Sequence, residues 1–367
     1  MRLRRCTCRY CVGQRFFPAM RKLATLIGVL LAVHVAMLFV QPRNAETAPA
    51  TNAVKIGVVF DVGGRGDKSF NDGAAAGSIR AEKELGATIR YIEPGESSDR
   101  EAGLRLLAAE RMDLVVGVGF IFTDDLNQLA NEYPTIRFAG IDYAVAADAE
   151  GNPIMPPPNV AALRFREEEG SFLVGAIAGL VTKTQTVGFV GGMNVPLIQK
   201  FDAGYAAGVK QVCPSCRVIS QYAGVTPDAF RNPGKGKEIA FSQYQRGADI
   251  IYHASGSTGL GVFEAARQSS KLAIGVDADQ WSEMPGFILT SMVKRIDNAL
   301  FDAAKRVKEG SFRGGIYDFG LAQDGVGYVY DEHNRALIPD AVRQRVEQLK
   351  AQVVAGKIHV PVVPRAQ

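Results

Sequence analysis

The sequence predicts an α/β protein in which two doubly wound parallel sheets form two lobes with a ligand cleft between them. Three observations support this prediction. Short apolar, β-branched runs alternate with helical patterns from residue 54 onward, which is typical of parallel sheets with helical crossovers. A proline-rich stretch, GNPIMPPPN (151–159), divides the alternation into two halves. Polar residues and glycines follow the strands of both halves, at the edge where open α/β sheets bind ligands.

The first half opens with the strand VKIGVVF (54–60), whose continuous apolar character fits a strand buried on both faces. Helices and strands then alternate, and right-handed crossovers bring successive strands into one parallel sheet. We expect helices at 70–85, 99–110 and 123–132, and further strands at 87–93, 112–119 and 135–142.

The second half restarts at NVAALRF (159–165), directly after the proline-rich stretch. The same alternation then continues to residue 309. We expect strands at 159–165, 186–192, 216–224, 248–255, 271–277 and 287–293, and helices at 167–182, 196–212, 233–247, 258–269 and 294–309.

Composition excludes several classes of protein. With 47% hydrophobic and 22% charged residues in 367, the chain is neither disordered nor a disulfide scaffold, and its length suits roughly two domains. Residues 1–50 contain eight of the 42 basic residues and one of the 38 acidic ones, which leaves the remainder mildly acidic. Clustered basic residues, which nucleic-acid binding requires, are not evident there, so we expect no nucleic-acid partner.

The N-terminal 50 residues form an extension with the features of an export signal. Arg21 and Lys22 precede the apolar run LATLIGVLLAVHVAMLFV (23–40), and Ala48-Pro49-Ala50 follows as a small-residue site. We expect a periplasmic protein, or one anchored in the membrane by this segment and facing the periplasm. Met20 is an alternative start to Met1.

The five cysteines fall into two groups. Cys6, Cys8 and Cys11 precede the apolar run and resemble a metal site only loosely. Cys213 and Cys216 form a C-x-x-C motif in the exported body, where a local disulfide between helix and strand is favoured over a redox motif or half of a zinc site. The four histidines lie far apart in the sequence, so no metal site and no cofactor are expected.

Candidate cleft residues follow the predicted strands in both halves, although turns and helix caps explain any single one of them equally well. These residues are Asp61, Phe120 and Asp142 in the first half and Met193, Ser255, Gly256 and Asp277 in the second. His253, near the end of a predicted strand, is better explained as a structural histidine with a hydrogen-bonding partner than as a catalytic residue. No nucleophile elbow or phosphate-binding loop is present in the sequence.

The chemistry of the predicted cleft favours a neutral ligand. Three carboxylates, which accept hydrogen bonds, accompany a single lysine, Lys294, and would repel a phosphate. Phe70, Phe230 and the amide of Asn71 add flat apolar faces and hydrogen-bonding capacity. A nucleoside therefore suits this set better than a nucleotide.

The sequence also resembles a known family along nearly the whole of 54–362. The motifs that carry the resemblance, in order, are VFDVGGRGDKSFNDGAAAG (59–77), EEEGSFLVGAIAG (167–179), FVGGM (189–193), FDAGYAAGVKQV (201–212), GVDADQ (275–280) and TSMVKRIDNA (290–299). They are similar to those of the basic membrane protein family, solute-binding proteins of ABC importers that include the PnrA-like purine nucleoside receptors.

This resemblance implies the type I periplasmic-binding-protein fold, with two lobes joined by three crossings, over a solute-binding region of 51–367. We expect one lobe over about 54–158 plus 292–318, and the other over about 159–291 plus 319–362. By motif, Phe70 and Phe230 correspond to the rings that stack on the base. Asp61, Asn71 and Asp142 correspond to residues at the base edge, and Asp277, Lys294 and Ser255–Ser257 to residues at the ribose.

The implied function is capture of purine nucleosides outside the cytoplasm and their delivery to the permease subunits of an ABC importer, without catalysis. The turn Gly256-Ser257-Thr258-Gly259 departs from the family's usual Gly-Gly-Thr-Gly, the lipoprotein cysteine is absent, and segment 280–288 is short. Binding of a nucleobase or a sugar remains an alternative, as does an exported nucleoside-processing enzyme.

Overall fold

The structure is a computed structural model that describes residues 27–28, 30–31, 53–95 and 99–364. Most of the expected export segment, including its basic flank and cleavage site, and the cysteines at 6, 8 and 11 lie outside the described residues. Within the described residues, no helix combines the length and apolar character that crossing a membrane requires. The chain separates into two units, Met1–Asn52 and Ala53–Gln367, and the account below concerns the second.

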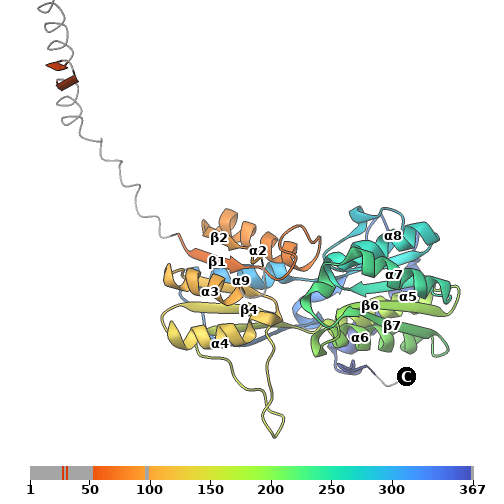
Figure 1. Cartoon of the computed structure of the whole chain (residues 1–367). Coiled ribbons are helices and arrows are strands. Elements are labelled where there is room, and N and C mark those ends of the chain that lie inside the picture. The colour runs from red at the N-terminus through yellow and green to blue at the C-terminus, as the bar shows by residue number, and fades with distance from the viewer. Residues whose placement is uncertain (1–26, 29, 32–52, 96–98, 365–367) are drawn as a thin grey trace, which may run out of the picture. The chain divides into compact units, whose positions relative to one another are not determined.

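The first lobe is built on a sheet of six parallel strands in the order β11-β5-β4-β3-β1-β2 (Figure 1). Apolar residues of β1 such as Ile56 and Val58 are fully buried, as expected for a strand covered on both faces. The strands are β1 (Lys55–Val59), β2 (Thr88–Ile92), β3 (Leu114–Val118), β4 (Arg137–Ile141), β5 (Val160–Phe165) and β11 (Gly315–Phe319).

The second lobe is built on a sheet in the order β12-β10-β9-β8-β6-β7, in which β12 is antiparallel to β10 and the other pairs are parallel. Its strands are β6 (Thr186–Met193), β7 (Arg217–Gly224), β8 (Ile250–Ala254), β9 (Leu272–Asp277), β10 (Ile288–Lys294) and β12 (Val326–Tyr328). The predicted α/β class with two doubly wound sheets is therefore confirmed.

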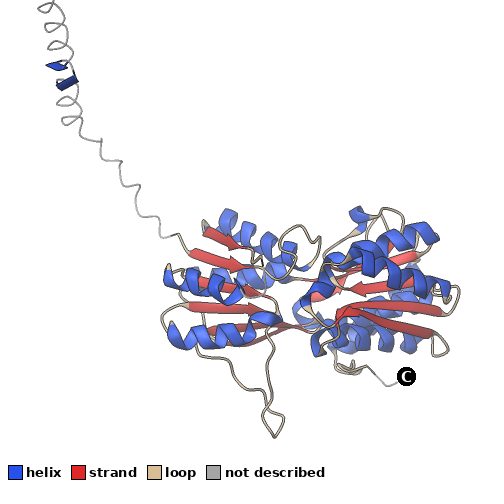
Figure 2. Ribbon diagram, viewed as in Figure 1, coloured by secondary structure: helices blue, strands red, loops and turns tan. Residues whose placement is uncertain are grey.

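Helices cover both sheets (Figure 2). Those of the first lobe are α2 (Phe70–Leu85), α3 (Asp99–Ala109), α4 (Thr123–Glu132) and α9 (Ile296–Lys308). Those of the second lobe are α5 (Glu167–Val181), α6 (Pro196–Val212), α7 (Pro233–Gln245), α8 (Gly259–Ser269) and α10 (Asp340–Val354).

Two of the sequence motifs that carry the family resemblance form the tight seam between α5 and α6. A Cβ atom added at Gly175 would lie 2.2 Å from the Tyr205 carbonyl oxygen, and one at Gly208 would lie 2.0 Å from the Phe172 carbonyl oxygen. Only glycine allows the two backbones to approach this closely. Gly175 and Gly208 therefore allow the close packing of α5 against α6.

The expected boundary between the lobes at residues 158 and 159 is wrong. Strand β5 pairs with β4 and β11 in the first sheet, so the chain leaves the first lobe only at Arg166. It returns through Arg295, between β10 and α9, and leaves again at Gly320, after β11. The proline-rich segment 151–159 lies in the loop between β4 and β5, within the first lobe. Proline is excluded from the interior of strands, so a proline-rich run indicates a loop but not the end of a domain.

The first and third crossings bond to each other, and at the second crossing Arg295 N donates to Gly325 O, just after the third, at 2.8 Å. Arg166 N donates to Phe319 O at 3.1 Å, and Leu321 N donates to Glu169 Oε2 at 2.8 Å. A Cβ atom at Gly320 would lie 2.6 Å from Glu169 Oε2, so the carboxylate of Glu169 packs closely against this crossing. The described chain thus has a compact set of connections between the two lobes.

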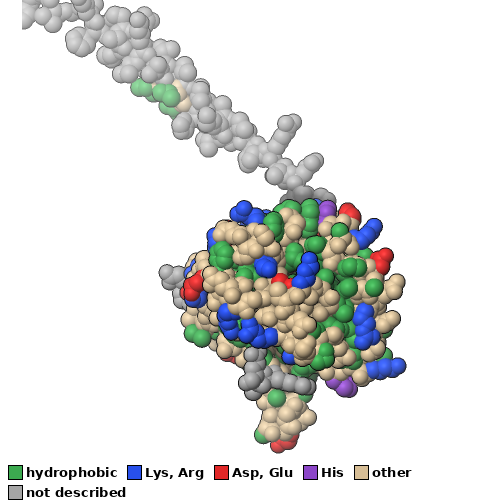
Figure 3. Space-filling model, turned by 90° about the vertical axis from the view of Figure 1, so that its right-hand side faces the viewer, with side chains coloured by type: hydrophobic (Ala, Val, Ile, Leu, Met, Phe, Trp, Pro, Cys, Tyr) green, Lys and Arg blue, Asp and Glu red, His purple; other side chains and the backbone are tan. Residues whose placement is uncertain are grey.

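The surface shows dispersed charge. On the face of the molecule in Figure 3, Lys and Arg side chains form several separate groups, with apolar and acidic side chains between them. This face does not carry the continuous basic strip that a nucleic-acid backbone requires.

Candidate functional site

The first lobe contributes two acids to the site from the ends of neighbouring strands. Asp61 follows β1, and Asp142 follows β4 with a positive φ of 59°. Asp277 ends β9 in the second lobe and also has a positive φ, of 65°. Aspartate tolerates this left-handed conformation better than most residues, but it still costs free energy, and such positions concentrate at functional sites.

These three acids line one cavity with about 570 Å³ of empty space, part of it open to solvent. Both lobes contribute to its wall. Of the twelve binding residues expected from the sequence, ten line it: Asp61, Phe70, Asn71, Phe120, Asp142, Phe230, Ser255, Gly256, Asp277 and Lys294.

Two expected residues, Met193 and Ser257, are not among the residues that line the cavity. Met193 ends β6 and is half-buried. Ser257 Oγ instead donates to the Phe230 carbonyl oxygen at 3.0 Å, which fixes the turn that carries Phe230. Ser257 was expected to contact the ligand because it lies in the turn that follows β8 (Ile250–Ala254). Its hydroxyl group instead bonds to the protein backbone.

The cavity wall also includes seven residues that the sequence analysis did not identify: Val62, Asp67, Leu197, Ile198, Phe201, Ala254 and Val276. Asp67 has a clear local role, because its carboxylate accepts from the backbone N–H groups of Ser69, Asn71 and Asp72 at the start of α2. Phe201 lies within a quoted motif, FDAGYAAGVKQV, but nothing in that motif distinguishes its cavity-facing residue from its core residues.

Phenylalanine rings from both lobes give the cavity its apolar walls. Phe70 begins α2, and Phe230 ends a short 3-10 helix that precedes α7. A Cβ atom at Gly192 would lie 2.3 Å from Cε1 of Phe230, so the second glycine of FVGGM makes room for that ring. Phe230 is half-buried, which leaves part of the ring available to a ligand.

Lys294 is the centre of a buried charge network. Its Nζ lies 2.6 Å from Asp142 Oδ2 and 3.3 Å from Glu167 Oε1. It also faces the rings of Phe70 and Phe201, at 5.1 and 5.5 Å from their centroids. Although burial alone would lower the pKa of Lys294, the neighbouring carboxylates raise it above its ordinary value, so the ammonium group stays charged.

Glu167 extends this network to the first crossing. It is fully buried at the start of α5, and its Oε2 accepts from Lys200 Nζ at 3.1 Å. Burial raises its pKa, but the charges of Lys200 and Lys294 outweigh this effect and hold the pKa below its ordinary value. The positive charge of Lys294 is thus already neutralised by the protein.

The three strand-end acids have raised pKa values. Burial raises the pKa of Asp61 to about 7, although the Val62 N–H and Arg100 oppose the shift. Burial raises the pKa of Asp142 to about 6 against the attraction of Lys294, and it raises that of Asp277 to about 6 as well. Burial thus brings the pKa values of these three acids closer to neutral pH than those of exposed aspartates.

One carboxylate oxygen of the site lacks a partner. Within the described chain, Asp142 Oδ1 is buried and accepts no hydrogen bond, while Oδ2 is paired with Lys294. The other acids are better satisfied: Asp61 Oδ1 accepts from Val62 N at 2.6 Å, and Asp277 Oδ2 accepts from Ser69 Oγ at 2.5 Å. A buried acceptor with no partner is costly, so this oxygen stands out among the acids of the cavity.

Contacts between the lobes lie beside the cavity. The Ser69–Asp277 hydrogen bond joins the start of α2 to the end of β9, and Gln280 Nε2 donates to the Lys68 carbonyl oxygen at 2.9 Å. The Lys294–Asp142 pair joins β10 to the end of β4. The two sets of site residues are thus held against each other by polar contacts.

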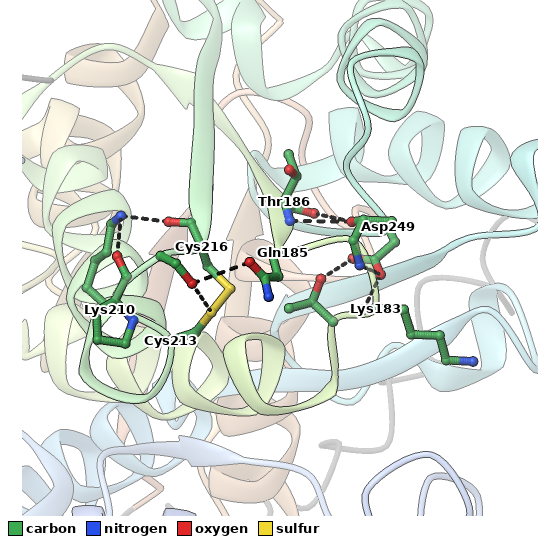
Figure 4. Close-up of a disulfide and its surroundings, with 11 residues drawn as sticks. Lys183, Gln185, Thr186, Lys210, Cys213, Cys216 and Asp249 are labelled. Carbon is green, nitrogen blue, oxygen red and sulfur yellow. Dashed lines mark hydrogen bonds between the residues drawn. A yellow bond between two sulfur atoms is a disulfide. The ribbon is translucent and has the colours of Figure 1, made fainter.

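The C-x-x-C cysteines lie outside the residues that line the cavity. A disulfide joins Cys213, at the end of α6, to Cys216, just before β7, with the two Cα atoms 5.3 Å apart (Figure 4). Lys210 Nζ donates to the Pro214 and Cys216 carbonyl oxygens, which ties the same turn to α6. Among the described residues, no group of His, Cys, Asp and Glu is arranged to hold a metal ion.

Known proteins resemble this chain over most of its length. The family of PnrA-like ABC transporter substrate-binding proteins matches residues 53–362. An uncharacterized lipoprotein of Pyrococcus abyssi is 37% identical over 326 residues, covering 84% of this chain and 77% of its own. The ABC transporter nucleoside-binding protein BmpA of Lactococcus lactis is 31% identical over 367 residues, covering 93% and 99%.

A solved structure shows the same arrangement of elements. The ABC transporter solute-binding protein from Aeropyrum pernix superimposes with a TM-score of 0.74 at 31% sequence identity. The match covers 86% of this chain and 94% of that protein. The fold and the sequence therefore point to the same set of relatives.

Proposed function

The chain belongs to the family of PnrA-like ABC transporter substrate-binding proteins, and from this premise we propose that it captures purine nucleosides for import. The family consists of binding proteins that serve a transporter rather than of enzymes. The proposal adds the ligand class and the place where the protein acts.

The observation that carries the proposal is the unpartnered Oδ1 of Asp142. It is an acceptor on a residue that lines the cavity, where the other acids, Asp61, Asp67 and Asp277, also favour donors over anions. A nucleoside brings such donors, both on its ribose hydroxyls and on the N–H groups of a purine. Capture of a donor would relieve the cost of leaving this oxygen buried and unpaired.

The paired state of Lys294 argues against a phosphorylated ligand. Lys294 is the one basic residue among those that line the described cavity, and Asp142 and Glu167 already neutralise it. A phosphate entering here would meet acids without a free cation. The half-buried ring of Phe230 and the ring of Phe70 supply apolar faces for a flat base, on which stacking is favourable.

The relatives guide the proposal for location and partner. Lipoproteins occur among them, and the Lactococcus relative is described as a nucleoside-binding protein of an ABC transporter. We infer that this chain is exported by its N-terminal segment and works in the periplasm or attached to the membrane. Its partners would be the permease subunits of an importer.

Binding and chemistry can be separated in one experiment. Isothermal titration calorimetry would compare inosine, inosine 5′-monophosphate, hypoxanthine and ribose, and chromatography would then test the inosine sample for free hypoxanthine. We expect inosine to bind most tightly and to be recovered intact. Equal binding of the monophosphate would contradict the charge argument, tighter binding of hypoxanthine or ribose would favour the alternative ligands, and released base would indicate an enzyme.

A pair of variants tests the role of Asp142. Asp142→Asn replaces one carboxylate oxygen by an N–H donor, and we expect it to weaken inosine binding by about tenfold or more, because hydrogen bonds to charged groups contribute about 1.5–3 kcal/mol. The matched control is Asp318→Asn, an exposed acid on β11 of the same sheet that pairs with Arg164. An unchanged affinity in Asp142→Asn would remove this residue from the binding site.

A further inference from the structure

A line of three buried side chains lies behind one wall of the cavity. Ser255 lines the cavity, and its Oγ lies 3.3 Å from Nδ1 of His253. The other ring nitrogen of His253, Nε2, lies 3.1 Å from Oε1 of Gln280. All three side chains are at most 1% exposed, so every polar atom in this line must find its partner within the protein or in the ligand.

The orientation of the Gln280 amide is fixed by two backbone groups. Its Oε1 accepts from Val276 N–H at 2.8 Å, and its Nε2 donates to the Lys68 carbonyl oxygen at 2.9 Å. The reversed orientation would bring two donors together at Val276 and two acceptors together at Lys68. Gln280 therefore presents an acceptor, Oε1, to His253.

This acceptor determines which nitrogen of His253 carries the proton. A hydrogen bond to Gln280 Oε1 requires a proton on Nε2. Burial lowers the pKa of His253 to about 4, so the ring is neutral at physiological pH and has no second proton. Nδ1 is then an acceptor, and the hydroxyl proton of Ser255 points to it.

The ring is also held in place by close packing. It contacts Phe263 edge-on, with 5.0 Å between ring centroids, and a Cβ atom at Gly259 would lie 2.0 Å from its Cε1. This packing restricts the tilt of the ring, and the contacts of Nδ1 with Ser255 and of Nε2 with Gln280 favour this orientation over a ring turned by 180°.

We propose that His253 and Gln280 are positioning residues for ligand specificity: they make Ser255 a hydrogen-bond acceptor toward the cavity, so that it selects a ligand hydroxyl group. With its proton held by His253, Ser255 Oγ can only accept from a ligand. A hydroxyl can donate to it, whereas a fluorine or a carbonyl oxygen in the same place cannot. The identification of this hydroxyl as one on a ribose rests on the proposed function.

The first test is independent of any ligand. NMR spectroscopy of the full chain with ¹⁵N-labelled histidine distinguishes the two neutral forms of the ring. We expect the signal of a neutral ring protonated at Nε2 for His253 at pH 7. A ring protonated at Nδ1, or an imidazolium, would overturn the inference, and this result stands even if inosine does not bind.

The second test measures selection of the hydroxyl group. Calorimetry would compare inosine with its 2′-fluoro-2′-deoxy and 3′-fluoro-3′-deoxy analogues, in which fluorine replaces a donor. We expect the wild-type protein to bind one analogue about 3- to 10-fold more weakly than inosine, as loss of one hydrogen bond predicts. In Ser255→Ala this difference should shrink to within about twofold.

Two variants of Gln280 distinguish positioning from a purely structural role. Gln280→Glu keeps a carboxyl oxygen to accept from His253 Nε2, and we expect it to retain the selectivity even if its overall affinity falls. Gln280→Met removes this acceptor, and we expect its selectivity to fall to that of Ser255→Ala. His333→Gln, at an exposed histidine that does not line the cavity, is the matched control.

The outcomes are separable. Equal affinity of wild-type protein for inosine and both analogues would overturn the inference while the proposed function stands. Full selectivity in Gln280→Met would also overturn it. Absence of inosine binding would contradict the proposed function, and the NMR measurement would then decide the inference alone. If Gln280→Met does not fold, Ser255→Ala and the NMR measurement still decide it.

Discussion

Individual side chains in the cavity combine two kinds of recognition, apolar faces and buried charge. Phe230 belongs to the first kind, because its half-buried ring rests against Gly192 and lines the cavity. A base that stacks on this ring would gain about 1–3 kcal/mol. We therefore expect Phe230→Ala to weaken inosine binding by about 5- to 150-fold in calorimetry.

The control for this change is Phe241→Ala, at a half-buried phenylalanine on α7 that does not line the cavity. It should lower the melting temperature and leave the affinity unchanged. A large loss of melting temperature in Phe230→Ala, with unchanged affinity, would assign Phe230 to the core of the second lobe instead.

The buried acids give binding and stability opposite dependences on pH. The pKa of Asp61 is about 7 in the folded protein, above its ordinary value of 3.8, so between these values the folded state holds more protons than the unfolded state. The contribution of Asp61 to the free energy of unfolding therefore increases as pH falls, and it is lost as pH rises through 7. Ligand donors need the charged carboxylate, which is lost as pH falls below 7. Inosine affinity should therefore fall as pH falls, while the contribution of Asp61 to stability rises.

Both effects can be measured from pH 8 to pH 5.5, by calorimetry for inosine affinity and by thermal unfolding for the unliganded protein. Asp61→Asn, which cannot titrate at this position, should show a weaker dependence in both measurements. If the inosine affinity of the wild-type protein stays constant across this range, inosine binding does not depend on the charge of these carboxylates.

Helices, strands and the turns between them account for most of what could be predicted from sequence. Continuous apolar runs such as 54–60 identify buried strands, and the acids that follow them could be assigned to one sheet edge by topology alone. The sequence analysis did not predict α10 or the strands β11 and β12. The two strands are short and lie in a glycine-containing segment with little periodicity.

Other features depend on packing that no local pattern reveals. Proline-rich segment 151–159 resembles a domain boundary in sequence, but β5 after it pairs within the first sheet. Leu197 and Phe201 lie on α6, and only the seam between α5 and α6 decides which side of that helix meets the cavity.

The disulfide turn provides a prediction about the link between α6 and β7. Replacing both Cys213 and Cys216 by serine opens a short loop, so the chain-entropy model gives a loss of about 2 kcal/mol in the free energy of unfolding. We expect a lower melting temperature for this variant with inosine affinity unchanged, since the turn does not line the cavity. A variant that folds but no longer binds inosine would contradict this separation.

In the whole molecule, a ligand that binds between the lobes stabilises both of them. For a chain that begins at Ala50, we expect inosine at about 100 times its dissociation constant to raise the free energy of unfolding by about 2.7 kcal/mol. Inosine 5′-monophosphate at the same concentration should raise the melting temperature much less. Equal shifts for the two compounds in thermal unfolding would contradict the proposed preference for uncharged ligands.

The three crossings also determine when each lobe is complete during synthesis. Strand β11 at the edge of the first sheet comes from residues 315–319, and α9, which packs on α2, comes from residues 296–308. A nascent chain that has already produced β1 to β5 still lacks both elements. The N-terminal part of the protein therefore cannot reach its final fold until most of the chain has been made.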